Sequence, residues 1–103
     1  MNFGLPEKSM SMIVGALSGC SEIEQAAIFG SRAAGNYKRG SDVDLVIYGY
    51  LVTGDIVSRL SCLLNEELPL PYFFDILHYE SISNEQLKSN IDVQAKLIYV
   101  RKR

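Results

Sequence analysis

The sequence predicts an α/β protein of the α+β kind, in which helices flank a small β-sheet. Short apolar segments that fit buried strands alternate along the chain with segments whose apolar residues recur at helical spacing. The composition, 48% hydrophobic and 21% charged residues, is that of a globular chain. A length of 103 residues corresponds to a single domain, residues 1–103, with one core. The predicted element order is α-β-α-β-α-β-α.

The N-terminal half is predicted to hold two helices and two strands. Apolar residues recur at helical spacing between Pro6 and Gly19, a residue pair that suits the start and the end of a helix. The predicted strands are Glu24–Phe29 and Val43–Tyr48, which are apolar and are each followed by a glycine. Between them, Ser31–Tyr37 is predicted to contain a short helix.

The C-terminal half is predicted to continue with a helix, a strand and a helix. The first helix runs from Thr53, a candidate N-cap, to Glu67, and prolines beyond it stop it. Tyr72–Tyr79 is the third predicted strand. The last helix starts at Ser83-Asn84-Glu85-Gln86, which has the form of a capping box. Lys96–Val100 fits a final short strand.

Charge, hydropathy and cysteine content exclude several classes of protein. Ten Lys and Arg against twelve Asp and Glu give a net charge of −2, so nucleic acid is not expected as a direct ligand. No apolar run approaches the ~18 residues of a membrane helix, and the start shows no secretory signal. Cys20 and Cys62 form no C-x-x-C pair and are expected to be reduced and buried. The expected location is the cytoplasm.

The segment that begins at Gly30 carries the first candidate binding residues. Gly30 and Gly35 have the spacing of a phosphate loop, but Asn36-Tyr37 stands where that loop requires Lys followed by Ser or Thr. Glycine at position 30 allows the backbone to approach a phosphate closely, and a helix starting at Ser31 would direct N–H groups at it. Arg32 adds a cation within reach of the same anion.

Asp42 and Asp44 are the candidate metal ligands. Residues i and i+2 of a strand project from one face, about 6.6 Å apart, so these carboxylates lie together and repel each other. A cation between them is the simplest explanation, and carboxylate oxygens suit Mg²⁺. In Tyr72–Tyr79, Asp75 is a single charge among apolar residues. If this strand neighbours Val43–Tyr48, Asp75 joins the pair, and three carboxylates with two metal ions form a phosphoryl-transfer site.

This pattern resembles a known superfamily. Gly30-Ser31, ten residues, Asp42-x-Asp44 and a later strand carboxylate at Asp75 are similar to the nucleotidyltransferase superfamily that includes DNA polymerase beta. More narrowly, Gly-Ser-Arg-Ala-x-Gly followed by Ser-Asp-x-Asp-Leu resembles the minimal nucleotidyltransferases, small bacterial and archaeal proteins commonly encoded beside a HEPN-domain protein. The resemblance covers essentially the whole chain and implies the nucleotidyltransferase fold with a small mixed β-sheet.

The resemblance also implies a role for each motif residue. Gly30-Ser31 would hold the triphosphate of ATP, the usual donor of the family, and Arg32 would assist. Asp42 and Asp44 would ligate two Mg²⁺ ions. Asp75 would bind the ion that activates the incoming hydroxyl and would serve as its base. These roles describe an enzyme that transfers a nucleoside monophosphate to a hydroxyl and releases pyrophosphate.

The implied partner is a HEPN-domain toxin encoded nearby, and the implied acceptor is a tyrosine of that toxin, so that the protein acts as its antitoxin. The predicted elements use the whole chain, so no second domain is left to present an acceptor. Two alternatives stay open: an antitoxin that neutralises by binding alone, and a nucleotidyltransferase for small molecules such as aminoglycosides. Self-association is also expected, since a small domain with an open sheet edge often pairs.

Three further groups of polar residues are predicted to lie outside the chemistry. His78 is the only histidine and lies on the strand face opposite Asp75, which favours a structural or surface role. Lys38 and Arg39 fit a solvated turn. Arg101-Lys102-Arg103 fits a loose end of the chain.

Overall fold

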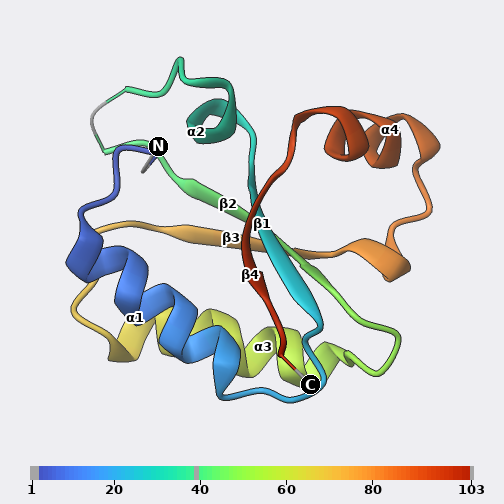
Figure 1. Cartoon of the computed structure of the whole chain (residues 1–103), viewed down its shortest axis with the longest axis horizontal. Coiled ribbons are helices and arrows are strands. Elements are labelled where there is room, and N and C mark those ends of the chain that lie inside the picture. Colours follow the sequence, from blue (N-terminus) through green and yellow to red (C-terminus); the bar gives the residue numbers. More distant parts are fainter. Residues whose placement is uncertain (1–2, 39, 103) are drawn as a thin grey trace.

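A four-stranded sheet forms the centre of the computed structural model, which describes residues 3–38 and 40–102 (Figure 1). The predicted order of elements is confirmed, including the final strand. The elements are α1 (Glu7–Ser18), β1 (Gln25–Phe29), α2 (Ser31–Ala34), β2 (Val43–Tyr48), α3 (Gly54–Cys62), β3 (Phe74–His78), α4 (Glu85–Gln94) and β4 (Lys96–Val100).

The sheet is mixed, as expected, with the strand order β3-β2-β1-β4. β1 pairs antiparallel with both β2 and β4, whereas β2 and β3 are parallel. Parallel strands need a long crossover connection, and α3 provides it here. The parallel register sets Asp44 of β2 beside Asp75 of β3.

The main core lies between one face of the sheet and the helices α1 and α3. Figure 1 shows these two helices together on one side of the strands, with α4 on the other side. Alternate residues of the strands face the helices, which is the period of two that a half-buried strand requires. Fully buried members of this cluster are Ile13, Leu17, Ile28, Val43, Leu45, Ile47 and Leu64. The opposite face of the sheet is left to the polar residues of the candidate site and to α4, whose Ile91 is also fully buried.

The segment between β2 and β3 departs from the predicted helix. Thr53 is the N-cap, as expected, and its Oγ1 accepts a hydrogen bond of 3.3 Å from the N–H of Ile56. The α-helix ends at Cys62, however, and the remaining residues Leu63–Glu67 form a π-helical turn. The predicted strand Tyr72–Tyr79 is shortened to Phe74–His78.

Asn65 connects this π-helical turn to the first residue of β3. Its Nδ2 donates to the Phe74 carbonyl (3.1 Å), and its Oδ1 accepts from the Phe74 N–H (2.7 Å), as a neighbouring strand would. We expect Asn65→Ala to lower the free energy of unfolding by about 2 kcal/mol, because both main-chain groups lose their partner. Urea denaturation measures this change.

The matched control is Asn90→Ala, because Asn90 Oδ1 accepts a hydrogen bond from the exposed side chain of Gln86 (3.1 Å). We expect this variant to stay within about 0.5 kcal/mol of the wild type. Equal stability of the two variants would show that the Asn65 amide does not hold β3 in place.

The start of α4 is one residue later than predicted. Asn84, not Ser83, is the N-cap, and its Oδ1 accepts a hydrogen bond of 3.0 Å from the N–H of Leu87. Tyr79, which follows β3, donates to Asp92 Oδ1 of α4 (2.7 Å) and stacks on Tyr48 of β2 with ring centroids 5.0 Å apart. These contacts fix α4 against the sheet.

His78 has the structural role that its position predicts. Its Nε2 lies 2.8 Å from the Gly49 carbonyl, and its Nδ1 lies 2.6 Å from Ser81 Oγ. The carboxylate of Glu80 lies 3.2 Å from Nε2 and also accepts from the Gly49 N–H (3.0 Å). The end of β3 is thereby tied to the turn that follows β2.

Both cysteines are free thiols, but only part of their expected environment is found. Cys20 is half-buried and Cys62 is exposed, so the expectation of burial is wrong for Cys62. In the described ranges, no helix is both long and apolar enough to cross a membrane. Two of the residues that the sequence suggests for solvated segments, Arg39 and Arg103, lie outside the described residues.

Candidate functional site

Gly30 brings the end of β1 against the carboxylate of Asp44. The antiparallel register pairs Phe29 with Asp44, so the next residue of β1 turns directly beside that side chain. Gly30 has φ of 75° and ψ of −148°, a conformation that is essentially restricted to glycine. A Cβ at this position would collide with Asp44 Oδ2 and would lie 3.2 Å from its Cγ. Glycine is therefore required both by the backbone and by the carboxylate.

Ser31 begins α2, the short helix that the sequence predicts within Ser31–Tyr37. It ends at Ala34, because Gly35 adopts a left-handed conformation with φ of 85° and donates its N–H to the Ser31 carbonyl (3.0 Å). Gly30 and Ser31 therefore stand at the junction of β1 and α2. This junction is at the same end of the sheet as the start of β2.

Asp42, Asp44 and Asp75 come from two adjacent strands. Asp42 is exposed and directly precedes β2, whereas Asp44 is half-buried within it. Asp75 is exposed on β3 and is the register partner of Asp44. The strand pairing on which the predicted grouping depends is thus present.

Asp44 is the carboxylate of the three whose pKa responds to its burial and to the other two. Partial burial raises the pKa of Asp44 above its ordinary value of 3.8, and repulsion from Asp75 and then from Asp42 raises it further. A divalent cation would relieve this repulsion, and carboxylate oxygens are suitable ligands for Mg²⁺. Within residues 3–38 and 40–102, no three His, Cys, Asp or Glu side chains converge into a closed metal site. The aspartates therefore fit a cation in their chemistry, without being gathered around a single point.

The raised pKa of Asp44 gives a direct prediction for the metal-free protein. We expect an NMR titration to show Asp44 losing its proton at higher pH than an ordinary aspartate. In Asp75→Asn, one source of repulsion is removed, so the midpoint of Asp44 should move to lower pH. An unchanged midpoint in that variant would contradict the coupling between the two strands.

Arg32 belongs to α2 and is only 2% exposed. Its Nε and Nη2 donate to the Ser41 carbonyl at 3.2 and 2.8 Å, and its Nη1 donates to the Phe3 carbonyl at 2.8 Å. The rings of Tyr37 and Tyr72 lie on the guanidinium, with centroids 5.1 and 5.2 Å from Cζ. These contacts engage the guanidinium with main-chain carbonyls, whereas the sequence suggests a contact with the triphosphate.

The sequence does not predict that Ser41, Tyr37 and Tyr72 contact Arg32. Tyr37 and Tyr72 belong to segments far apart in the chain, and neither a spacing nor a motif links them to Arg32. The only available signal was that a cation inside an otherwise apolar helix turn needs partners.

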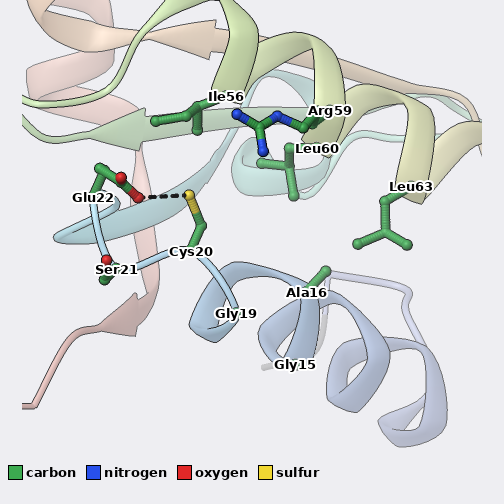
Figure 2. Close-up of a pocket in the computed structure, with 10 residues that line it drawn as sticks. All are labelled: Gly15, Ala16, Gly19, Cys20, Ser21, Glu22, Ile56, Arg59, Leu60 and Leu63. Carbon is green, nitrogen blue, oxygen red and sulfur yellow. Dashed lines mark hydrogen bonds between the residues drawn. The ribbon is translucent and has the colours of Figure 1, made fainter.

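A separate cavity of about 410 Å³ lies between the C-terminal end of α1 and α3 (Figure 2). It is lined by residues of α1, α3, the segment Gly19–Glu22 and the first residue of the π-helical turn, and none of the predicted site residues lines it. Cys20 Sγ donates to Glu22 Oε1 (3.3 Å) in its wall, and burial, followed by this hydrogen bond, raises the pKa of the thiol. A protonated thiol is a poor nucleophile, so this environment makes Cys20 less reactive than an ordinary cysteine.

Comparison with known proteins gives the same family as the motif. The family model for polymerase beta nucleotidyltransferases matches residues 12–103, a range that contains all six predicted site residues. No curated protein sequence matches the chain.

Three solved structures illustrate the fold. A toxin–antitoxin complex with AMP-PNP has 18% identity and a TM-score of 0.70, over 95% of this chain and 76% of that chain. The toxin–antitoxin complex MntA–HepT has 16% identity and a TM-score of 0.69, over 93% and 74%. A complex of a tri-AMPylated Shewanella oneidensis HEPN toxin with its MNT antitoxin has 15% identity and a TM-score of 0.68, over 92% and 72%.

These likenesses confirm the predicted fold, and the family match confirms the predicted enzyme class. The match runs through the Gly30-Ser31 junction, Asp42 just before β2, Asp44 in β2 and Asp75 in β3. The chain therefore belongs to the polymerase beta nucleotidyltransferase family.

Proposed function

We propose that this protein transfers AMP from ATP to a hydroxyl group of a HEPN-domain partner, with Mg²⁺ as cofactor and a tyrosine as acceptor, and that it thereby acts as an antitoxin. The observation that carries the proposal is the register of Asp44 with Asp75 beside Gly30, where burial and the neighbouring carboxylates raise the pKa of Asp44. The proposal is supported by family membership and by the neighbours of the same fold, a complex with AMP-PNP and a complex with an AMPylated HEPN toxin.

In this proposal the aspartates of β2 and β3 hold the metal, and the Gly30-Ser31 junction holds the triphosphate. Two Mg²⁺ ions, when bound, neutralise charge on the triphosphate and make the acceptor hydroxyl more acidic. Asp75 is the exposed member of the Asp44–Asp75 pair, so it is the carboxylate that accepts the hydroxyl proton. The acceptor oxygen bonds to the α-phosphorus, the bond from that phosphorus to the β-phosphate oxygen breaks, and pyrophosphate leaves.

The test is the intact mass of a HEPN-domain partner protein, after incubation of the two proteins with ATP and Mg²⁺. We expect the partner to gain whole AMP units and Asp42→Asn to give no gain. The matched control is Asp55→Asn, which removes a carboxylate from the first turn of α3 and should leave the gain unchanged. Peptide mapping then identifies the acceptor residue.

Two outcomes would replace the proposal. Co-purification of the partner without a gain in mass would favour an antitoxin that neutralises by binding alone. Transfer of AMP to an aminoglycoside, with none to the partner, would favour a small-molecule acceptor. Because the reaction consumes ATP, the proposal also places the protein in the cytoplasm. Light scattering during the same purification reports whether the chain self-associates.

A further inference from the structure

Arg32 links the two halves of the site motif through the protein backbone. It stands two residues after Gly30, in α2, and its guanidinium reaches the carbonyl of Ser41, the residue directly before Asp42. The segment between Gly35 and Ser41, in which Asn36, Lys38 and Gly40 are exposed, separates these halves in the chain. The pairing of β1 with β2 holds Asp44 beside this junction, and the contact of Arg32 with Ser41 is a second link, which reaches the residue before Asp42.

The chemistry around Arg32 is that of a structural brace. A buried cation is costly unless it is well paired, and no carboxylate lies within ion-pair distance of Arg32 among the residues that the structure describes. Its charge is met instead by two carbonyls and by the faces of two tyrosine rings. With two of its nitrogens on the same Ser41 carbonyl, the guanidinium fixes the direction of that peptide group as well as its distance.

Ser41 is also held from its other side. Its N–H donates to the Lys38 carbonyl (3.0 Å), and its Oγ accepts from the Lys38 N–H (2.8 Å). The peptide group that leads into Asp42 is therefore clamped between a turn and the guanidinium. Asp42 itself is exposed, so the backbone behind it is what defines the position of its carboxylate.

We propose that Arg32 is a positioning residue for Asp42, which sets that carboxylate for metal binding, and that it is not a ligand of the triphosphate. The inference rests on the proposed function of Asp42 as a metal ligand. It departs from the role that the motif suggests, because a phosphate contact would use the charge of Arg32, whereas a brace uses the planar shape of its guanidinium.

The test compares Arg32→Lys with the wild type. Lysine keeps the positive charge but loses the planar guanidinium, which donates two hydrogen bonds to the Ser41 carbonyl. We expect Mn²⁺ binding to the protein without nucleotide, followed by electron paramagnetic resonance, to weaken about tenfold. In the transfer reaction we expect kcat to fall about thirtyfold while the KM for ATP stays within about threefold, since misplacement of one ligand affects the transition state. Lys38→Gln, which removes an exposed cation of the same loop, should leave all three quantities within about twofold.

Two results would overturn the proposal. One is wild-type behaviour of Arg32→Lys together with a raised KM for ATP in Arg32→Gln, which would show that the charge of Arg32 binds phosphate. The other is unchanged Mn²⁺ affinity in a folded Arg32→Lys. If Arg32→Lys does not fold, Tyr37→Leu is the substitute variant, because it removes one of the two aromatic rings that contact the guanidinium. It should weaken Mn²⁺ affinity about threefold, and an unchanged affinity would overturn the proposal equally. Mn²⁺ binding needs no acceptor, so the Mn²⁺ affinities can be interpreted even if AMP transfer is not observed. Absence of Mn²⁺ binding in the wild type would count against the metal site itself.

Discussion

Asp44→Asn is expected to abolish nucleotidyl transfer and, at the same time, to make the metal-free protein more stable. The loss of activity should be about a thousandfold or more, because Asp44 is proposed as a metal ligand, and such a ligand contributes several kcal/mol to transition-state stabilisation. The gain in stability follows from the raised pKa of Asp44, since an acid whose pKa is raised on folding stabilises the folded state only below its unfolded pKa. That stabilisation is lost as the pH rises through the folded pKa, so at neutral pH the charged Asp44 destabilises the fold.

Thermal unfolding at pH 7 without metal measures the second effect. We expect the Tm of Asp44→Asn to rise by about 2–4 °C, a small shift because Asp44 is only half-buried. Asp42→Asn is the matched comparison. Because the Asp42 carboxylate is exposed, this variant should lose activity with little change in Tm. A lower Tm for Asp44→Asn would mean that the Asp44 carboxylate makes stabilising contacts that outweigh its burial and repulsion.

Gly30→Ala should produce the second large effect, a combined loss of stability and activity. Alanine at φ of 75° and ψ of −148° is strained, and its Cβ would collide with the carboxylate of Asp44. We expect the free energy of unfolding to fall by about 3 kcal/mol and transfer by about a hundredfold, because the displaced carboxylate no longer faces its partners. Chemical denaturation and the partner-mass assay measure the two losses.

Gly35→Ala is the control for the collision. Gly35 also has a positive φ, of 85°, but a Cβ there would meet no atom within 4 Å. We expect it to lose only about 1 kcal/mol from backbone strain and to keep most of the activity. Equal losses in the two variants would show that the contact with Asp44 does not matter.

The parts of the fold that depend on regular periodicity could be predicted from the sequence. The apolar run over Val43–Tyr48 predicts a buried strand and the helical spacing over Pro6–Gly19 predicts a helix, and the structure confirms both elements. The neighbourhood of Asp44 and Asp75 was predictable only on condition that their strands are adjacent. Periodicity assigns a residue to a face, but strand order is decided by packing over the whole chain.

The features that were missed depend on single side chains. The π-helical turn has the apolar residues of a continuing helix, and what distinguishes it is the bond of Asn65 to β3, a contact made only after folding. The contacts of Arg32 join three segments that are distant in the sequence, so a motif that names the residue cannot show which way its guanidinium points.

The parallel pairing of β2 with β3 has a consequence for how this chain can change in evolution. Because side chains alternate across a strand, inserting or deleting one residue between Leu68 and Phe73 would shift the register by one. Asp75 would then face the helices, and Phe74, now 1% exposed, would face water. The segment before β3 is therefore closed to changes of length, whereas the exposed turn at Tyr50 and Leu51 lies at the other end of β2 and can accept them. Insertions and deletions in related enzymes should therefore accumulate away from the aspartates. Changes of specificity near the aspartates should come from substitutions.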